Sequence, residues 1–172
     1  MNAFVALLRA INVGGTGKLP MSDLTALCET AGFTAVKTYI ASGNVVFKSS
    51  LPEAKAQAKL ARALTIKLGK PAGVTLRTAD ELDAVIEHNP FKKAAPNQVL
   101  IVFANETLSA EAFAKVQAPG GEELKLRGKE LFIYFPDGMG RSKLKVPFAK
   151  EGTGRNLNTV TKLATMVREL TK

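Results

Sequence analysis

The chain of 172 residues contains no tryptophan, one cysteine and one histidine. The single cysteine, Cys28, excludes an intramolecular disulfide framework, and one cysteine with one histidine cannot form a Cys/His zinc cluster. A Ser-His-Asp triad would depend on His88 alone, and Cys28 falls on the apolar stripe of a predicted helix, where a core role is expected. Glu122 and Glu123 fit a turn better than a paired acid/base site. No covalent nucleophile is identified, and no cofactor is indicated.

Long apolar runs are also missing. None approaches the roughly 18 to 20 residues that a membrane-spanning helix needs. Residues 1–9 have the pattern of a strand rather than of a signal peptide. The composition, 46% hydrophobic and 23% charged, is typical of a globular protein, and the length suits one domain or two small halves. We therefore expect a cytoplasmic protein without a membrane partner.

Acidic residues are scarce near the C-terminus. The net charge is +9, and residues 141–172 hold eight Lys or Arg against two Asp or Glu. This imbalance favours anionic partners such as nucleic acid, phosphorylated metabolites or acidic proteins. A basic surface without a dedicated partner accounts for the same charge, so both interpretations stay open.

Apolar runs and turn residues alternate in a pattern that predicts an α+β protein. Strands are expected at residues 3–9, 34–40, 45–48, 74–78, 98–103, 123–127 and 131–135. Helices are expected at residues 20–31, 53–68, 79–88, 109–116, 141–150 (interrupted near Pro147) and 158–170. Capping boxes, in which a Ser or Thr and a Glu three residues later bond each other's backbone, are predicted at Ser50–Glu53 and Thr78–Glu81.

The first half therefore follows the order β-α-β-β-α-β, the split βαβ order of a ferredoxin-like unit. The second half follows β-α-β-β-α, with a helix where the last strand would stand. We expect two ferredoxin-like subdomains, at residues 1–78 and 98–172, joined by a helix and loop at 79–97. The duplication rests on element order alone, because no residue-level repeat is evident.

Three segments are richer in polar, glycine or basic residues than a turn requires: residues 9–18, 39–44 and 153–162. The first follows a strand and precedes a helix, which is the setting of phosphate-binding loops. It does not match the P-loop, which needs Gly in place of Asn12 and Ser or Thr in place of Leu19. Arg9, at the end of an apolar strand, needs a carboxylate, backbone carbonyls or an anionic ligand. A flexible connection or a structural ion pair is the plainer explanation.

The other two segments also have structural explanations. A tight hairpin turn requires only Gly43, so Ser42 and Asn44 could face solvent. In the last segment, Asn158 or Thr159 can cap the final helix, whose N-terminus favours an anion. Arg155 would add a bidentate cation, and Lys162 lies one turn farther on. Capping explains part of this cluster, which makes it the strongest candidate site.

A separate basic run contains Arg141, Lys143 and Lys145. On an extended strand the three would share a face, whereas on a helix they would spread around it. They form the candidate nucleic-acid contact, although a solvated surface is the simpler interpretation. Exposed aromatic residues are not interleaved with these cations, which argues against a base-stacking single-strand binder.

Four sequence stretches together resemble the bacterial domain-of-unknown-function family 1697. They are L-L-R-A-I-N-V-G-G (residues 7–15), K-L-P-M-S-D-L (18–24), T-Y-I-A-S-G-N-V-V-F (38–47) and G-R-N-L-N-T-V-T-K-L (154–163). The resemblance extends over nearly the whole chain, apart from residues 89–95. It implies an α+β fold of two subdomains and carries no established activity.

The leading hypothesis is a small phosphate-bearing ligand bound where the three polar segments meet, with mostly electrostatic chemistry. The residues expected to line that site are Arg9, Asn12, Gly14, Gly15, Lys18, Ser42, Asn44, Arg155, Asn156, Asn158 and Lys162. One alternative is a nucleic-acid-binding module that uses the basic C-terminal segment. Another is a protein-interaction scaffold whose polar segments are structural corners.

Overall fold

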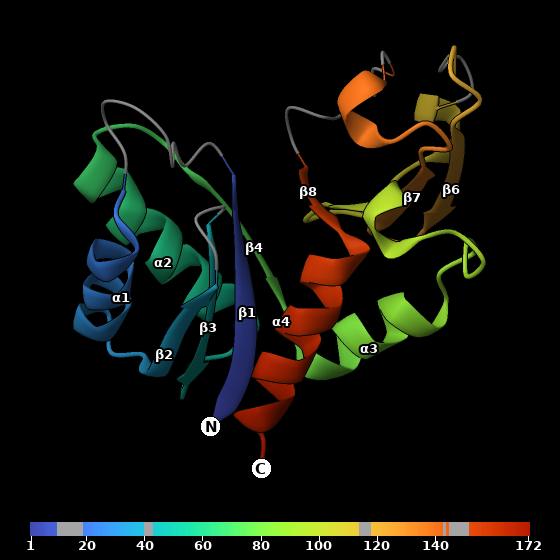
Figure 1. Ribbon diagram of the computed structural model, residues 1–172. Helices are drawn as coiled ribbons and strands as arrows, with labels where there is room; N and C mark the ends of the chain where they lie inside the picture. Colours follow the sequence, from blue (N-terminus) through green and yellow to red (C-terminus); the bar gives the residue numbers. More distant parts are fainter. Residues whose placement is uncertain (10–18, 40–42, 114–117, 143, 145–151) are drawn as a thin grey trace. The chain divides into compact units, whose positions relative to one another are not determined.

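The protein is described from a computed structural model, which covers residues 1–9, 19–39, 43–113, 118–142, 144 and 152–172 (Figure 1). The chain forms two compact units. Unit 1 comprises Met1–Leu82 and Leu163–Lys172, and unit 2 comprises Asp83–Lys162. Each contains one four-stranded antiparallel sheet, so the predicted α+β class is confirmed. The predicted subdomain boundaries at residues 78 and 97 stay a prediction.

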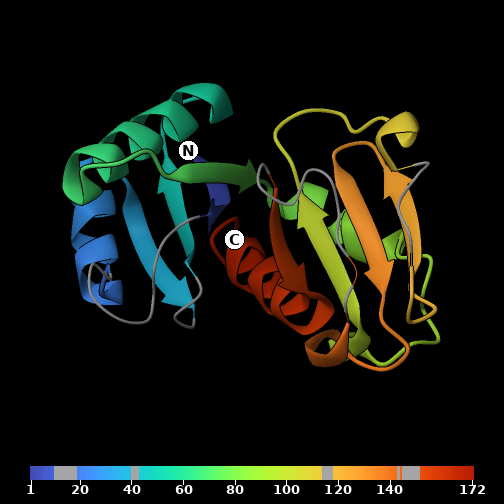
Figure 2. The same cartoon turned by 90° about the horizontal axis from the view of Figure 1, so that it is seen from above.

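Unit 1 follows the βαββαβ order expected for the first half, and its strands lie in the order β2-β3-β1-β4. Its elements are β1 (Asn2–Arg9), α1 (Met21–Thr30), β2 (Thr34–Tyr39), β3 (Asn44–Ser49), α2 (Glu53–Leu68) and β4 (Gly73–Arg77). Helices α1 and α2 lie on one face of the sheet (Figure 2). Between them and the strands, Phe33 stacks on Phe47 with ring centroids 4.2 Å apart. Alternating apolar side chains of β1 and β3 complete this core.

Unit 2 contains a sheet with the strand order β6-β7-β5-β8. Its strands are β5 (Val99–Phe103), β6 (Glu123–Arg127), β7 (Glu130–Tyr134) and β8 (Thr153–Asn156). Two helices cross from one unit to the other along the chain: α3 (Ala79–Glu87) begins in unit 1, and α4 (Leu157–Glu169) begins in unit 2 and ends in unit 1. In both sheets the first strand in sequence pairs with the third and the fourth.

The strand β8 corrects the predicted element order of the second half, which lacked it. Thr153–Asn156 pairs antiparallel with β5, in the segment expected to be a ligand-binding loop. The side chains of Thr153 and Arg155 are buried while Gly154 is exposed, which is the alternation of a strand. Polar residues and a glycine have low strand propensity, so this strand forms through its pairing with apolar β5.

The register of β4 and β8 reveals a residue-level repeat that the sequence analysis missed. In unit 1, Arg77 pairs with Val5 on the first strand, and Thr75 stands two residues before it. In unit 2, Arg155 pairs with Ile101, and Thr153 again stands two residues before it. Each arginine donates a hydrogen bond at 2.9 Å to the carbonyl of the residue that precedes it. The two units therefore share a Thr-x-Arg edge strand.

The residue after each arginine caps the next helix. Thr78 Oγ1 accepts the Glu81 amide at 3.2 Å, and Glu81 Oε1 accepts the Thr78 amide at 2.9 Å, which confirms the predicted Thr78–Glu81 capping box. Asn156 Oδ1 accepts the Thr159 amide at 2.9 Å at the start of α4. The prediction that Asn158 or Thr159 caps this helix is wrong, because the helix begins at Leu157.

The predicted capping box Ser50–Glu53 is also wrong. Pro52 occupies the N-cap position of α2 and has no side-chain capping bond. The serine that bonds the backbone in this loop is Ser49, whose Oγ accepts a hydrogen bond from the Leu51 amide at 3.0 Å. With Ser50 as the N-cap, the helix would begin at Leu51, whereas it begins two residues later, at Glu53.

The helix predicted at 109–116 is a 3₁₀ turn where it is described, at Ala110–Phe113. Of the described residues of the helix predicted at 141–150, only Arg141 lies in a 3₁₀ turn, Met139–Arg141. Ser142 has an extended backbone, and its Oγ accepts the Leu144 amide at 3.1 Å, a local bond that competes with a helix. The rest of the helices predicted at 109–116 and 141–150 lies outside the described residues. Among the helices that are described, none has the length and apolarity needed to cross a bilayer.

Candidate functional site

Two of the predicted ligand residues, Arg9 and Asn44, lie at one end of the unit 1 sheet. Strand β1 ends at Arg9, which pairs with Gly73 at the start of β4. Asn44 starts β3, where it pairs with Leu7 and with Tyr39, the last residue of β2. We refer to this end, with Arg9, Tyr39, Asn44 and Gly73, as the sheet terminus. The described parts of β1 and β2 end here, at Arg9 and Tyr39.

Arg9 lies across the backbone of its neighbouring strand. A methyl group at the Gly73 α-carbon would come within 2.9 Å of Arg9 Nε and 3.0 Å of Arg9 Cβ. Such distances are shorter than real Cβ contacts, so the arginine uses the space that glycine leaves. The Arg9 side chain is half-buried. The absence of a side chain at Gly73 therefore helps to determine the direction in which the Arg9 side chain extends.

Asn44 has a structural role that the sequence analysis left open. Its side chain is fully buried, and Nδ2 donates to the Tyr39 carbonyl at 3.1 Å, which closes the β2–β3 hairpin. Gly43, with φ +82°, accepts the Leu8 amide at 2.9 Å and so joins the turn to β1. The positive φ confirms that the turn requires this glycine. A ligand contact by Asn44 stays a prediction.

The remaining predicted residues of this group cannot be placed. They lie outside the described residues: Asn12, Gly14, Gly15, Lys18 and Ser42. Their contribution to a site stays a prediction from the sequence.

Arg155 and its neighbours form a second group, in unit 2. Arg155 is only 7% exposed, and it donates from the same guanidinium nitrogen to Thr153 Oγ1 and to the Gly154 carbonyl. Burial lowers the pKa of Arg155 to about 10, because desolvation disfavours the charged form. Asn156 is occupied as a helix cap, whereas Asn158 and Lys162 are exposed on α4.

The structure thus divides the predicted site residues between two units. Arg9 and Asn44 belong to unit 1, and Arg155, Asn156, Asn158 and Lys162 belong to unit 2. A single site that joins both groups stays a hypothesis.

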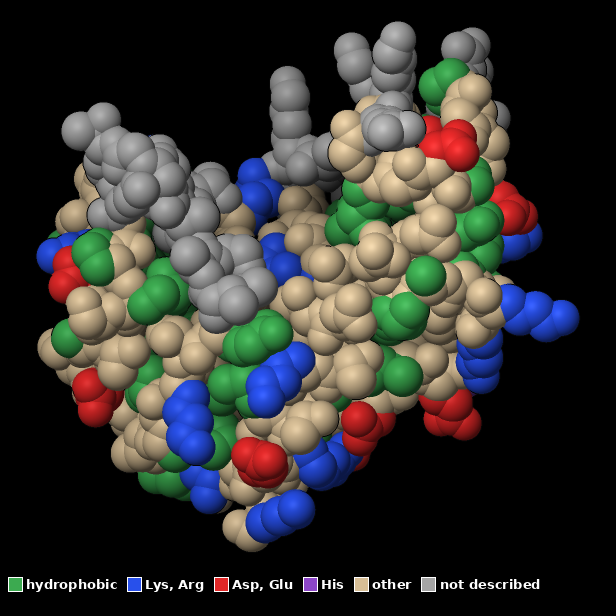
Figure 3. Space-filling view, in the orientation of Figure 1, with side chains coloured by type: hydrophobic (Ala, Val, Ile, Leu, Met, Phe, Trp, Pro, Cys, Tyr) green, Lys and Arg blue, Asp and Glu red, His purple; other side chains and the backbone are tan. Residues whose placement is uncertain are grey.

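The candidate nucleic-acid residues are only partly described. Arg141 ends the 3₁₀ turn Met139–Arg141, and Lys143 and Lys145 lie outside the described residues. On the face drawn in Figure 3, cationic side chains alternate with acidic ones and with neutral surface. That face therefore offers no continuous basic stripe among the residues drawn in colour.

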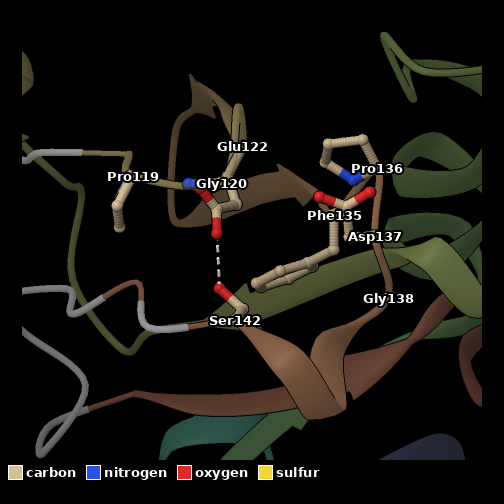
Figure 4. A pocket seen from close by; sticks show the side chains of 8 residues that line it. All are labelled: Pro119, Gly120, Glu122, Phe135, Pro136, Asp137, Gly138 and Ser142. Atoms are coloured by element: carbon tan, nitrogen blue, oxygen red, sulfur yellow. Dashed lines mark hydrogen bonds between the residues drawn. The ribbon is translucent and has the colours of Figure 1, made fainter.

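A cavity of ≈ 280 Å³ in unit 2 is lined by two carboxylates, of which the sequence analysis considered only Glu122. Glu122 and Asp137 stand on its wall, as does Ser142 (Figure 4). Ser142 donates to Glu122 Oε1 at 2.6 Å, and the Gly120 amide donates to Oε2 at 2.8 Å. The Ser142 hydrogen bond is the main reason that the pKa of Glu122 is lowered, with backbone hydrogen bonds adding to it.

These hydrogen bonds connect two turns, and we refer to the Glu122–Ser142 pair as the latch. Glu122 stays ionised and hydrogen-bonded, so it is a poor proton acceptor for Ser142, and the pair joins the Gly120 turn to the Ser142 turn. A sequence signal existed: P-G-G and P-D-G flank the β6–β7 hairpin, which places both turns at one end. Glu123, one residue on, starts β6 and lines a different cavity, so the two glutamates are not an acid/base pair.

Cys28 and His88, the remaining catalytic candidates, make structural contacts. Cys28 is a buried core residue, as predicted, and burial raises the pKa of its thiol to about 12. The His88 ring meets the Ala84 carbonyl at 2.8 Å through Nδ1, at the end of α3. No group of three or more His, Cys, Asp or Glu suited to a metal ion occurs within the described parts of the chain.

Comparison with known proteins gives the family. The sequence pattern of the family described as "Protein of unknown function (DUF1697)" matches residues 1–132. The chain belongs to DUF1697. The match contains the sheet terminus and the Glu122 turn, whereas the DUF1697 resemblance noted at residues 154–163 lies beyond its end.

A solved structure shares the fold. The chain is similar to the conserved bacterial protein SP0830 from Streptococcus pneumoniae, with 24% identity and a TM-score of 0.79. The alignment covers 96% of this chain and 98% of that protein. At this identity the likeness shows the fold alone. No curated protein matches the chain.

Proposed function

We propose that the protein binds a small phosphate-bearing anion at the sheet terminus of unit 1, with Arg9 as its principal cation. The observation that carries this proposal is the placement of Arg9 across Gly73. An arginine whose course is set by its neighbours loses less conformational freedom on binding than a free surface cation. Its half-buried guanidinium can present two parallel N–H donors to phosphate oxygens.

The position of Arg9 in the sheet supports the same proposal. Arg9 is the last residue of β1, and the polar residues predicted to bind the ligand follow it directly in sequence. Ser42 lies in the sequence between Tyr39, which ends β2, and Asn44, which starts β3. Lys18, Asn12 and Ser42 are the predicted side-chain partners, and Gly14 and Gly15 the predicted backbone donors. We propose that any chemistry there is electrostatic.

The second cationic group is a further candidate contact for such an anion. Arg155 is buried beside the start of α4, and Asn158 and Lys162 are exposed on that helix. An anion near this helix N-terminus would offset part of the desolvation that lowers the pKa of Arg155. Whether this group shares one ligand with Arg9 is part of the proposal.

Three finer expectations also stay proposals. A ferredoxin-like description of both units is supported by their common strand order, β2-β3-β1-β4 and β6-β7-β5-β8. A cytoplasmic location is an expectation from cysteine usage and composition. The nucleic-acid alternative keeps Arg141, Lys143 and Lys145 as its contacts, and the scaffold alternative requires no ligand.

A thermal-shift screen against phosphate, pyrophosphate, sugar phosphates and short oligonucleotides tests the proposal. A ligand at 100 times its Kd adds about 2.7 kcal/mol, which should raise the Tm by about 5 to 10 °C. Arg9→Gln should remove the response, and Lys55→Gln, an exposed charge deletion on α2, should keep it. Stabilisation by oligonucleotides only, and only at low salt, would favour the nucleic-acid alternative. No response to any compound would favour the scaffold.

A further inference from the structure

We propose that unit 2 has a second, independent ligand site that takes a nucleoside phosphate. The site is a cavity of ≈ 530 Å³ between the loop after α3 and the β6–β7 hairpin. Residues from both segments line it: Asn89, Pro90, Phe91, Lys92, Lys93, Ala94, Glu123, Lys125 and Tyr134. The volume falls within the range of small-molecule sites. We refer to it as the lysine–aromatic cavity.

Two aromatic rings provide its apolar surface. Phe91 and Tyr134 come from the two different segments, and their ring centroids are 5.7 Å apart with an interplanar angle of 30°. Both side chains are half-buried, so each contacts the other and still faces the cavity. Partly exposed aromatic rings of this kind are stacking surfaces for a planar base.

Three lysines supply the charge. Lys92, Lys93 and Lys125 line the cavity and are exposed, against one acidic residue, Glu123. Three cations and one anion give the lining a formal charge of +2. Ammonium groups on flexible stems are point-charge donors that suit a phosphate group. A ligand with both a planar ring and a phosphate would use both kinds of surface at once.

Asn89 adds a polar group to the wall of the cavity. The side chain is only 4% exposed, and Oδ1 accepts the Phe91 amide at 3.0 Å. Because a backbone N–H can only donate, this bond identifies the oxygen and leaves the side-chain NH₂ as the donor. Such a donor suits a ring nitrogen, a carbonyl or a ribose hydroxyl. The bond also orients Phe91.

The chemistry is distinct from that of the sheet terminus. Arg9 offers a bidentate cation at the end of a strand, whereas the lysine–aromatic cavity joins a pair of aromatic rings to separated cations. The two sites lie in different units, so loss of one need not affect the other. The nucleoside phosphate could be a free nucleotide or part of a single-stranded nucleic acid.

Calorimetric titration with adenosine 5′-monophosphate tests the proposal. In the Arg9→Gln protein, whose sheet terminus lacks its principal cation, we expect saturable binding at least tenfold tighter than that of adenosine or ribose 5-phosphate, because each lacks one recognised group. Lys92→Gln with Lys93→Gln should weaken binding at least tenfold, since both lysines are exposed and can change without loss of fold. Lys129→Gln, made in the same Arg9→Gln protein, is the matched control in the β6–β7 turn.

Tyrosine fluorescence can locate the ligand. The chain has no tryptophan and two tyrosines, so Tyr39→Phe leaves Tyr134 as its only strong emitter. The nucleotide should quench this emission in the Tyr39→Phe protein, with the same midpoint as the heat signal. The Lys92→Gln, Lys93→Gln form of that protein should need at least tenfold more nucleotide, which controls for light absorbed by the ligand.

The results distinguish all the readings. If a hexa-adenylate binds more tightly than the mononucleotide and its affinity falls steeply with salt, the site exists and its natural ligand is a single-stranded nucleic acid. If the hexa-adenylate and the mononucleotide bind with equal affinity, the site exists and its natural ligand is a free nucleotide. The proposal is overturned if ribose 5-phosphate binds as tightly as the nucleotide, if the double lysine variant keeps full affinity, or if neither nucleotide nor oligonucleotide binds. Binding abolished by Arg9→Gln without Tyr134 quenching would assign the nucleotide to the sheet terminus instead.

Discussion

The contact between Arg9 and Gly73 shows how one missing side chain can position a functional group. A cation at the end of an apolar strand needs polar surroundings, and glycine on the adjacent strand lets the guanidinium lie close to the backbone. The same argument applies at Gly43, where a Cβ would approach Leu8 Cβ to 3.1 Å and the positive φ excludes most residues.

We predict that Gly73→Ala destabilises the protein by about 1 to 3 kcal/mol, the usual cost of overpacking. The added methyl group would meet Arg9 Nε at 2.9 Å and displace the side chain. Denaturant unfolding measures the effect, with Gly140→Ala as control, because no atom lies within 4 Å of a Cβ there. In an Arg9→Ala background the cost should shrink. Equal stability of the two glycine variants would contradict this packing.

The Glu122–Ser142 latch predicts a specific pH dependence. In the folded protein the pKa of Glu122 lies below its ordinary value of about 4.5. The ionised Glu122 therefore stabilises the fold fully at pH values above about 4.5. The effect disappears as the pH falls through the folded pKa. Ser142→Ala removes the main cause of the shift. We expect its Tm to be lower than that of the parent protein above pH 5, with the gap narrowing towards pH 3. A gap of constant size would argue against the latch.

At the scale of elements, the two edge strands β4 and β8 perform equivalent roles. Each carries Thr-x-Arg, and in each the residue after the arginine caps the next helix. The Thr78 box is a local motif and was predictable from the sequence. The equivalence of Arg77 and Arg155 was not, because it depends on which residue of the first strand each one faces.

Capping gives a matched set of variants. Thr78→Ala and Asn156→Ala should each lower the free energy of unfolding by about 0.5 to 2 kcal/mol, since each leaves a helix N-terminal amide without its partner. Ser50→Ala should change it by less than about 0.5 kcal/mol, because this exposed hydroxyl does not cap α2. Urea denaturation measures all three. If Ser50→Ala lowers the free energy of unfolding as much as Thr78→Ala does, the Ser50–Glu53 capping box exists after all.

The strengths and failures of the sequence interpretation have local causes. Periodic apolar runs predicted the positions of β1, α2 and β7, since burial alone determines them. Strand β8 was missed because Gly154 and polar neighbours give no strand signal until β5 pairs with them. The lysine–aromatic cavity was missed because Phe91 and Tyr134 are far apart in sequence and meet only in the fold. Arg9, by contrast, was recognisable as a cation in an apolar strand.

At the scale of the whole molecule, the C-terminal end of the chain completes unit 1. Leu163–Lys172 belongs to that unit although the sequence before it belongs to unit 2. Leu163, Val167 and Leu170 in this segment are buried.

Removal of residues 163–172 should therefore damage unit 1. Burial of a leucine or valine contributes about 1.5 to 3 kcal/mol each, which for three side chains approaches the whole stability of a typical domain. We expect the truncated chain to lose the cooperative unfolding of unit 1, measured by hydrogen exchange at β1 and β3 amides. Full protection of these amides in the truncated chain would show that residues 1–82 fold alone.

The central claim is that Arg9 binds a phosphate-bearing anion, and calorimetric titration with pyrophosphate tests it most directly. The account predicts saturable binding that Arg9→Gln weakens about tenfold or more, since a hydrogen bond to a charged group contributes about 1.5 to 3 kcal/mol. Lys55→Gln should bind as the parent protein does. Equal affinity of the parent and Arg9→Gln proteins, or no binding heat with either, would contradict the claim.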